Sequence, residues 1–221
     1  MSYILNIESA TKNCSVSIGY QGETVALKEL SAEQFNHAEK LHTFILECLQ
    51  SIGISLQDLA AVAVSKGPGS YTGLRIGVSA AKGFCYALDI PLISVDTLEI
   101  LTHQIKDVNG TIVPMIDARR MEVFTQNFNN QYQAVSDAYA LIVTETSFDD
   151  LEGVIHFCGD GAGKCKTVLN EERFRFHDEV VYPSAQQMSA LSFAKFQSRQ
   201  FEQVAYFEPY YLKDFMLTVK K

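Results

Sequence analysis

Lys66-Gly67-Pro68-Gly69-Ser70-Tyr71-Thr72-Gly73-Leu74-Arg75-Ile76-Gly77 is the stretch with the clearest structural signal in this chain. An apolar run at 60–65 precedes it and apolar residues at helical spacing follow it to residue 88, which predicts a buried strand, a glycine-rich turn and a helix. A helix that begins after such a turn offers free backbone N–H groups to an anion. The glycine spacing matches neither a Walker loop nor G-x-G-x-x-G. A tight turn capped by Ser70 or Thr72 is the simpler interpretation, and an anion cradle is the alternative.

Strand and helix patterns alternate on both sides of this turn. Before it, three short strands are predicted at 3–8, 14–20 and 24–30, and Asn36 is the predicted N-cap of an amphipathic helix over 36–52. After it, the first half of the chain ends with a strand at 91–95 and a helix at 97–105.

The second half of the chain repeats this order. Its predicted elements are strands at 111–116, 121–128, 138–143 and 154–158 and helices at 161–169 and 184–196. Because each half starts with strands joined by tight turns and continues into strand–helix units, the predicted fold class is α/β with a duplicated core. The polar segment 107–110 divides the two predicted lobes, which cover 1–106 and 107–221.

Composition narrows the classes of function. The chain has 221 residues, 47% of them hydrophobic, and no apolar run approaches the ~18 residues of a membrane-spanning helix. Its 26 acidic and 18 basic residues give a net charge of −8, so any contact with nucleic acid is expected to be local or made through a partner. Five cysteines without a C-x-x-C pair, and a first segment without a leader pattern, predict a cytoplasmic protein with no membrane contact.

The predicted helix after the glycine-rich turn has more apolar surface than contact with one sheet requires. It has one narrow polar stripe, one apolar stripe for the sheet, and a third stripe that contains Gly73, Gly77, Ala80 and Phe84. Small residues let another helix approach closely. This third stripe either contacts the helix at 36–52 in the same lobe or forms a subunit interface together with that helix, and the sequence leaves both open.

Two further segments could contact phosphate. Gly159 and Gly161 lie in a second glycine-rich turn between a predicted strand and a helix, where a nucleotide's adenosine could lie, although a plain connection is the more frequent meaning. Asp117-Ala118-Arg119-Arg120 is interpreted as a hairpin whose turn is capped by Asp117. A phosphate or partner contact is the alternative for this hairpin.

The histidines predict no metal site. His37 and His42 are five residues apart, which places them on different sides of one helix. His103, His156 and His177 stand alone in the sequence. Since no Ser-His-Asp order and no carboxylate pair is evident either, no catalytic residue is predicted.

The glycine-rich stretch closely resembles the TsaB family, also called YeaZ, of bacterial tRNA threonylcarbamoyladenosine synthesis. The likeness covers nearly the whole chain and includes five further segments: 7–10, 37–41, 90–98, 117–123 and 208–213. This resemblance implies the actin-like, ribonuclease H-like fold of the ASKHA superfamily, with two α/β lobes. It also implies a homodimer or heterodimer interface on the two helices, which we assign to Leu41, Ile45, Gly73, Gly77, Ala80 and Phe84.

The resemblance also implies a role. In this family such a chain is the non-catalytic partner of a related subunit, TsaD, which transfers a threonylcarbamoyl group onto the adenosine beside the anticodon of tRNA. We therefore expect a scaffolding subunit without catalytic residues. ATP and metal are expected on the TsaD-like partner, a TsaE-like ATPase is expected in the complex, and tRNA is expected to be reached only through the complex.

Two enzymatic alternatives remain. A small ATP-dependent phosphotransferase of the same fold would hold its nucleotide with the turn at Ser9 and Thr11 and the turn at Gly159 and Gly161, although Ser9-Ala10-Thr11 departs from the Asp-x-Gly-Thr phosphate loop of active relatives. A glycoprotease-like metallopeptidase would need the histidine pair of the catalytic relative. The matching stretch, Asp96–Leu101, contains no histidine.

Overall fold

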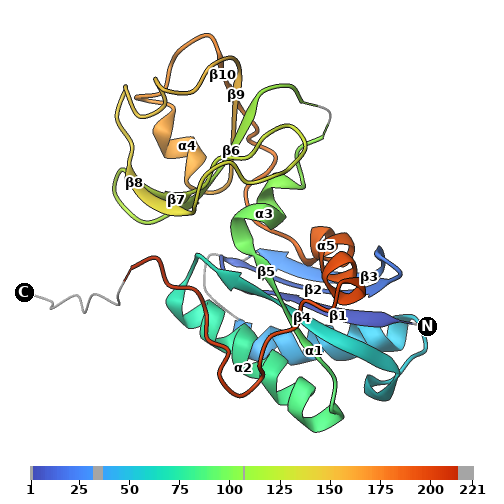
Figure 1. Cartoon of the computed structure of the whole chain (residues 1–221). Coiled ribbons are helices and arrows are strands. Elements are labelled where there is room, and N and C mark those ends of the chain that lie inside the picture. Colours follow the sequence, from blue (N-terminus) through green and yellow to red (C-terminus); the bar gives the residue numbers. More distant parts are fainter. Residues whose placement is uncertain (1, 32–36, 107, 214–221) are drawn as a thin grey trace, which may run out of the picture.

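The computed structural model describes residues 2–31, 37–106 and 108–213, which form two lobes (Figure 1). Each lobe contains one five-stranded β-sheet. α3 (Thr97–Thr102) and the segment that follows it lead from the first sheet into the second. Each lobe has a hydrophobic core of its own, beside its own sheet.

The first sheet combines an antiparallel meander with two parallel strands. The meander consists of β1 (Tyr3–Glu8), β2 (Asn13–Tyr20) and β3 (Glu23–Ser31). β4 (Leu59–Gly67) and β5 (Leu92–Asp96) add parallel strands on the other side of β1. The strand order is therefore β3-β2-β1-β4-β5.

The second sheet has the same order. Its meander consists of β6 (Thr111–Asp117), β7 (Glu122–Thr125) and β8 (Tyr139–Ile142). β9 (Ile155–Cys158) and β10 (Phe174–Phe176) pair in parallel on the other side of β6. The order β10-β9-β6-β7-β8, read in reverse, matches the first sheet strand for strand. The predicted α/β class with a duplicated core is confirmed.

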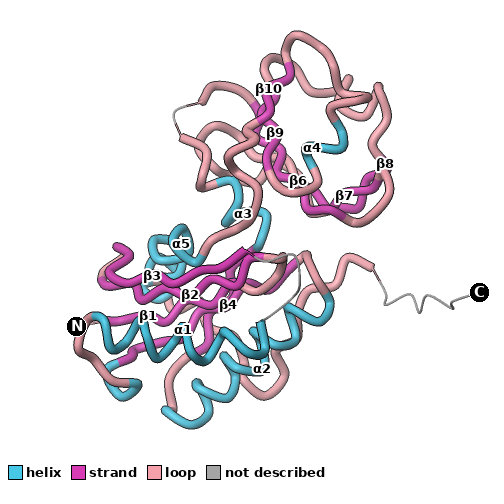
Figure 2. The backbone as a smooth tube through the Cα atoms, turned by 180° about the vertical axis from the view of Figure 1, so that it is seen from behind, coloured by secondary structure: helices cyan, strands magenta, loops and turns pink. Residues whose placement is uncertain are grey.

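Side-chain alternation along the strands determines which helices cover the first sheet. Leu5 and its neighbours on one face pack against α1 (His37–Ser51) and α2 (Tyr71–Leu88). Ile4 points to the opposite face and packs against α5 (Ala185–Gln197). Figure 2 shows α1 and α2 on one side of the sheet and α5 on the other. Because successive strand residues point to opposite faces, covering both faces buries most of β1, β2 and β4, whereas the edge strand β3 stays largely exposed.

α5 lies on the first sheet although it follows the second sheet in the chain (Figure 1). Its Met188 is fully buried in the core on that face. Its Ser192 donates a hydrogen bond to Asn6 of β1 at 2.7 Å, inside the lobe. The structure thus differs here from a division into 1–106 and 107–221. The segment 185–213 returns to the first lobe because that sheet would otherwise expose an apolar face.

Several predicted elements are shorter in the structure. α3 ends at Thr102, α4 covers only Ala162–Cys165, and β7 ends at Thr125 although the predicted strand continued to residue 128. Phe128 pairs with β6 only through an isolated bridge. Apolar residues in these places fill the core of the second lobe without regular pairing. β10 and the 3-10 helix Leu56–Asp58 were not predicted because they are too short to show a period.

The five cysteines are all buried and free. Burial raises the pKa of Cys14, Cys48 and Cys85 to about 11, so these thiols stay protonated at neutral pH. In the part of the chain that the structure describes, no helix is long and apolar enough to cross a bilayer. The predicted N-cap of α1, Asn36, lies outside the described residues.

Candidate partner-binding groove

The glycine-rich turn between β4 and α2 is held against the turn that follows β1. Ser70 is the N-cap of α2, and its hydroxyl accepts a hydrogen bond from Gly73 N–H at 3.3 Å. The Ser70 N–H donates to the Ala10 carbonyl at 2.6 Å. A Cβ at Gly69 or Gly73 would overlap backbone atoms of the β1–β2 turn, so this approach requires glycine. The structure shows the capped turn, with Ser70 rather than Thr72 as the cap.

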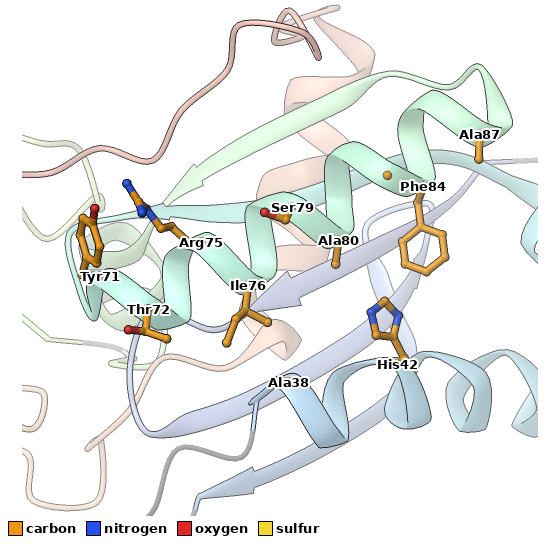
Figure 3. A pocket seen from close by; sticks show the side chains of 11 residues that line it. Ala38, His42, Tyr71, Thr72, Arg75, Ile76, Ser79, Ala80, Phe84 and Ala87 are labelled. Atoms are coloured by element: carbon orange, nitrogen blue, oxygen red, sulfur yellow. The ribbon is translucent and has the colours of Figure 1, made fainter.

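α1 and α2 leave an open groove of about 890 Å³ between them on the first lobe (Figure 3). The apolar part of its lining consists of Ala38, Ile76, Ala80, Gly83, Phe84 and Ala87. His42 of α1 and Phe84 of α2 face one another, with 5.9 Å between their ring centroids. An uncovered apolar groove of this kind is typical of a site that binds another protein.

The structure places the six predicted interface residues in two different environments. Ala80 and Phe84 line the groove. Leu41 and Ile45 of α1 are at most 1% exposed and belong to the core beneath the helix pair. Gly73 and Gly77 are buried as well, on the inner side of α2.

The small-residue stripe of α2 packs inside the lobe. A Cβ at Gly73 would overlap the Ser9 carbonyl, and a Cβ at Gly77 would overlap the Ser9 hydroxyl. The groove is lined instead by the neighbouring stripe of α2, which includes Ile76, Ala80, Gly83, Phe84 and Ala87. Sequence reasoning included Ala80 and Phe84 but missed Ile76, Gly83 and Ala87, although the helical spacing of three and four residues was a usable signal.

The C-terminal segment contacts two residues at one end of the groove, Tyr71 and Arg75. Tyr211 stacks on Tyr71, with 5.0 Å between ring centroids, and its hydroxyl accepts a hydrogen bond from Arg75 Nε at 3.2 Å. The Arg75 guanidinium also lies over the Tyr71 ring, 4.1 Å from its centroid. Two residues further on, Lys213 forms an ion pair with Glu122 of the second lobe. This segment therefore connects the end of the groove to the second lobe.

In the first lobe, the turn that would hold phosphate in an actin-like fold is occupied by the chain itself. Ala10 N–H donates to the Glu8 carboxylate at 2.6 Å, and Ser9 N–H contacts the Ser65 hydroxyl at 3.4 Å. The Ser9 hydroxyl donates to a carbonyl of α2 at 2.9 Å. Ser9 is fully buried and Thr11 is 4% exposed. Both predicted nucleotide contacts of this lobe therefore lie inside its packing.

The matching glycine-rich turn of the second lobe is also tightly packed. The N–H groups of Gly159 and Gly161 donate to the carbonyls of Val180 and Met115, at 2.7 and 3.0 Å. A Cβ at Gly159 would overlap the Met115 carbonyl. These glycines allow the turn to approach β6, as Gly69 and Gly73 do for β1 in the first lobe.

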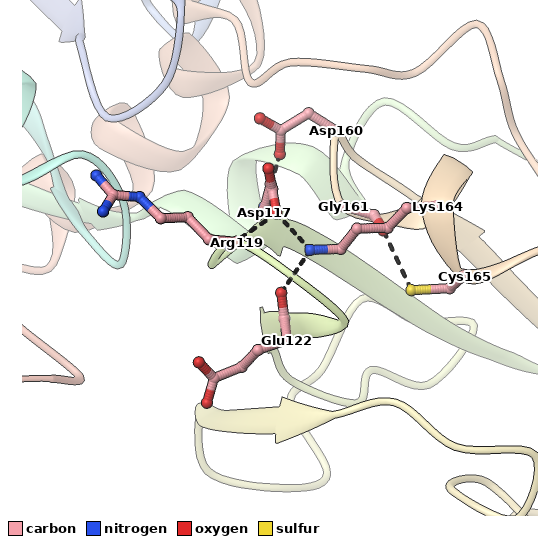
Figure 4. Close-up of polar contacts among 7 residues, drawn as sticks. All are labelled: Asp117, Arg119, Glu122, Asp160, Gly161, Lys164 and Cys165. Atoms are coloured by element: carbon pink, nitrogen blue, oxygen red, sulfur yellow. Dashed lines mark hydrogen bonds and ion pairs between the residues drawn. The ribbon is translucent and has the colours of Figure 1, made fainter.

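Asp117 and Lys164 form an ion pair beside this turn (Figure 4). The Lys164 ammonium also donates to the Glu122 carbonyl at 2.6 Å. The Arg119 N–H donates to the Asp117 carboxylate at 2.9 Å, so the predicted hairpin with Asp117 as its cap is confirmed. The Asp117 N–H donates to Asp160 at 2.9 Å. Burial raises the pKa of Asp160 above its usual value.

These turns do not fit the phosphates of a nucleotide. The backbone N–H groups of Ala10, Asp117 and Gly161 already donate to acceptors within the chain. The carboxyl groups of Glu8 and Asp160 accept two of these bonds, so a phosphate would meet acceptor oxygens instead of free donors. That the chain carries no cofactor of its own stays a prediction.

The histidines occupy unrelated places. His37 is buried and its Nε2 contacts the Thr11 carbonyl at 2.7 Å, whereas His42 faces the groove, so their predicted separation is confirmed. His156 and His177 stand alone in the sequence, but the fold brings their ring nitrogens to 2.9 Å. Within the described ranges, no group of three or more His, Cys, Asp or Glu side chains could hold a metal ion.

Comparison with known proteins gives consistent relatives. The family model described as TsaD, tRNA N6-adenosine threonylcarbamoyltransferase, matches residues 31–218. The tRNA threonylcarbamoyladenosine biosynthesis protein TsaB of Escherichia coli (strain K12) is 28% identical over 220 residues, which are 96% of this chain and 94% of that protein. The structure of YeaZ from Pseudomonas aeruginosa is similar with a TM-score of 0.83 and 22% identity, over 96% of this chain and 100% of that one. The ethanolamine utilization protein EutJ from Carboxydothermus hydrogenoformans has a TM-score of 0.55 and 9% identity, over 86% and 90% of the two chains.

The duplicated sheets and these structural relatives define a two-lobed α/β protein of the actin-like ASKHA fold. The chain belongs to the family of tRNA N6-adenosine threonylcarbamoyltransferases. Within this family, the predicted resemblance to TsaB, also called YeaZ, is confirmed.

Proposed function

We propose that this chain is a non-catalytic scaffolding subunit needed to make threonylcarbamoyladenosine in tRNA. It binds a TsaD-like relative through the groove between α1 and α2. That relative holds the nucleotide and metal and transfers the threonylcarbamoyl group onto the adenosine next to the anticodon. A TsaE-like ATPase joins the complex in the cytoplasm, and the same groove pairs two copies of this chain when the catalytic relative is absent.

The uncovered apolar groove carries this proposal. Ile76 and Phe84 are large side chains that remain only partly buried in the chain by itself. Covering apolar surface contributes about 25 cal/mol per Å². Gly73 and Gly77, on the inner stripe of α2, pack closely against Ser9, which fixes the position of the helix. The helix pair therefore offers a rigid surface to another helix pair.

The filled turns support the non-catalytic role. Lys164 occupies the second-lobe turn through its contacts with Asp117 and Glu122, and Glu8 accepts a backbone N–H in the first-lobe turn. No feature of these turns favours the phosphotransferase alternative. A chain that needs no nucleotide of its own can use both turns to stiffen its lobes.

Replacing Ala80 by Glu tests the groove directly. The change places a charge among apolar lining residues without entering the core, so affinity for the catalytic relative should fall by about 30-fold or more. Calorimetric titration of the two purified chains measures the affinity. Production of the modified nucleoside in the reconstituted reaction should fall with it and recover when the variant is supplied in excess.

A matched control uses the exposed face of the same helix. Tyr86 is 87% exposed and does not line the groove, so Tyr86→Glu should leave binding and modification unchanged. Thermal unfolding shows whether each variant is folded. Wild-type affinity in folded Ala80→Glu, or modification of tRNA by this chain without the catalytic relative, would contradict the proposal.

A further inference from the structure

The tip of the β6–β7 hairpin carries two consecutive arginines in a strained backbone conformation. Arg119 has a φ of 74° and Arg120 a φ of 51°. Both angles lie in the left-handed region, which residues with side chains avoid, and hairpin turns of this kind usually contain Asn and Gly. Both arginines are exposed, so burial does not explain their presence. Strain kept at an exposed tip points to a function of the two side chains.

The carboxyl groups around this tip are already compensated. Asp117 pairs with Lys164, and Glu122 pairs with Lys213. Asp160 accepts a hydrogen bond from the Asp117 N–H at 2.9 Å. The carboxylates of Asp117 and Glu122 are therefore paired with lysines and not with the two arginines.

Arg119 and Arg120 are left as two uncompensated cations. Among the described residues, neither side chain has an ion pair or a hydrogen bond. Figure 4 shows the Arg119 side chain extending away from Asp117 and Lys164. In a chain with a net charge of −8, these cations form a local positive patch.

We propose that Arg119 and Arg120 bind phosphate groups of an RNA backbone. A guanidinium group can donate two parallel hydrogen bonds to one phosphate, which an exposed pair at a hairpin tip is free to do. Backbone contacts of this kind orient an RNA without reading its sequence. The patch deepens the proposed function and rests on it, because the partner bound in the groove would bring the RNA.

The hairpin lies near the end of the proposed docking groove. Arg75 lines the groove and contacts Tyr211, while Lys213 pairs with Glu122 at the base of the hairpin. The two residue steps from Tyr211 to Lys213 span at most about 7 Å. An RNA held by a partner in the groove therefore has a short path to the arginines.

Substitution of both arginines by Gln tests this inference in the complex of the full chain with its catalytic relative. The probe is a fluorescein-labelled, unmodified tRNA transcript, titrated from about 50 to 200 mM salt. Affinity at the lowest salt should fall about 10-fold, and the slope of log Kobs against log[salt] should decrease by about 1 to 2 as two phosphate contacts are lost.

Arg199→Gln is the matched control. Arg199 is also an exposed arginine with a positive φ, 54°, but it lies just past α5, away from the hairpin. This variant should keep the wild-type affinity and salt slope. Equal affinity and slope for the double variant and wild type would overturn the inference. Loss of ATP or inorganic phosphate binding with unchanged tRNA binding would also overturn it, since the phosphate would then come from a free nucleotide or ion.

The same mixtures distinguish this inference from the proposed function. If the double variant assembles with the catalytic relative and binds tRNA normally, only the role of the arginines fails. If the wild-type chains do not assemble, the proposed function fails. The role of the arginines is then tested by measuring tRNA binding to the isolated chain at low salt. Weaker binding by the double variant than by wild type supports this role, and equal binding refutes it.

Discussion

Glu8 is fully buried at the end of β1, and its two carboxyl oxygens differ in their contacts. Oε1 accepts the Ala10 N–H at 2.6 Å, whereas Oε2 has no hydrogen-bond partner in the described structure. Burial raises the pKa of Glu8 from 4.5 to about 7, and the Ala10 hydrogen bond opposes this only in part. Because the pKa of Glu8 is higher in the folded chain than in the unfolded chain, protonation of Glu8 favours the folded chain. Its contribution to the unfolding free energy is complete below pH 4.5 and is lost as the pH rises through about 7.

Glu8→Gln keeps an acceptor for Ala10 and removes the charge. The pKa shift corresponds to a decrease of about 3 kcal/mol in the unfolding free energy of the wild type between acidic pH and pH ~8. The unfolding free energy of the variant should show little of this decrease, because Gln carries no charge at any of these pH values. At pH ~8 the variant should therefore be the more stable chain. Urea unfolding across this pH range measures the effect, with the exposed Glu23→Gln as control. Parallel pH profiles for wild type and Glu8→Gln would refute the role of this carboxyl.

At the scale of the element, α2 uses its glycines in two ways. Gly73 and Gly77 allow the helix to contact Ser9, where a Cβ would overlap backbone or hydroxyl oxygen. Gly83 lines the groove and has no atom within 4 Å of an added Cβ. Packing within the chain therefore requires glycine at positions 73 and 77 of this helix, but not at position 83.

This difference predicts opposite effects of the same substitution. Gly77→Ala should lower the unfolding free energy by about 1–3 kcal/mol because the methyl group overlaps the Ser9 hydroxyl in a packed core. Gly83→Ala should raise it by about 0.5–1 kcal/mol because alanine loses less backbone entropy in a helix. Urea unfolding of the two variants measures both. A Gly77→Ala chain as stable as Gly83→Ala would show that the helix moves aside freely.

At the scale of the whole molecule, the segment 185–213 completes the first lobe. α5 covers the face of the first sheet that α1 and α2 leave open, and the segment beyond it runs back along β5 to Tyr211. Lys195 also donates to the Ser94 carbonyl of β5 at 2.8 Å. The first lobe is therefore not complete until nearly the whole chain has been made.

Met188→Ala tests this dependence. Met188 is fully buried in the core between α5 and the first sheet. Loss of most of its side chain should lower the unfolding free energy by about 2–5 kcal/mol. Hydrogen exchange should become faster in β1 and β4, far from residue 188 in sequence. Gln197→Ala, at the exposed end of the same helix, is the control. Faster exchange confined to the second lobe would contradict the assignment of α5 to the first sheet.

Local sequence was sufficient for most elements of the first lobe. The strand patterns at 3–8 and 14–20 and the helix pattern at 72–88 agree with β1, β2 and α2 within one residue at each end. Such elements depend on side-chain period, caps and turns within a few residues. The second lobe was predicted less well because its short strands and its four-residue α4 are too short to show a clear periodicity of apolar residues.

The sequence by itself determined the duplicated α/β order, the capped glycine-rich turn and the resemblance to TsaB. Only the tertiary structure decided which stripe of α2 packs on Ser9 and which lines the groove, because two neighbouring stripes of small and apolar residues look alike until a sheet covers one of them. It also placed α5 on the first sheet and Lys164 beside Asp117. These contacts join residues far apart in the chain, and only packing in three dimensions selects among them.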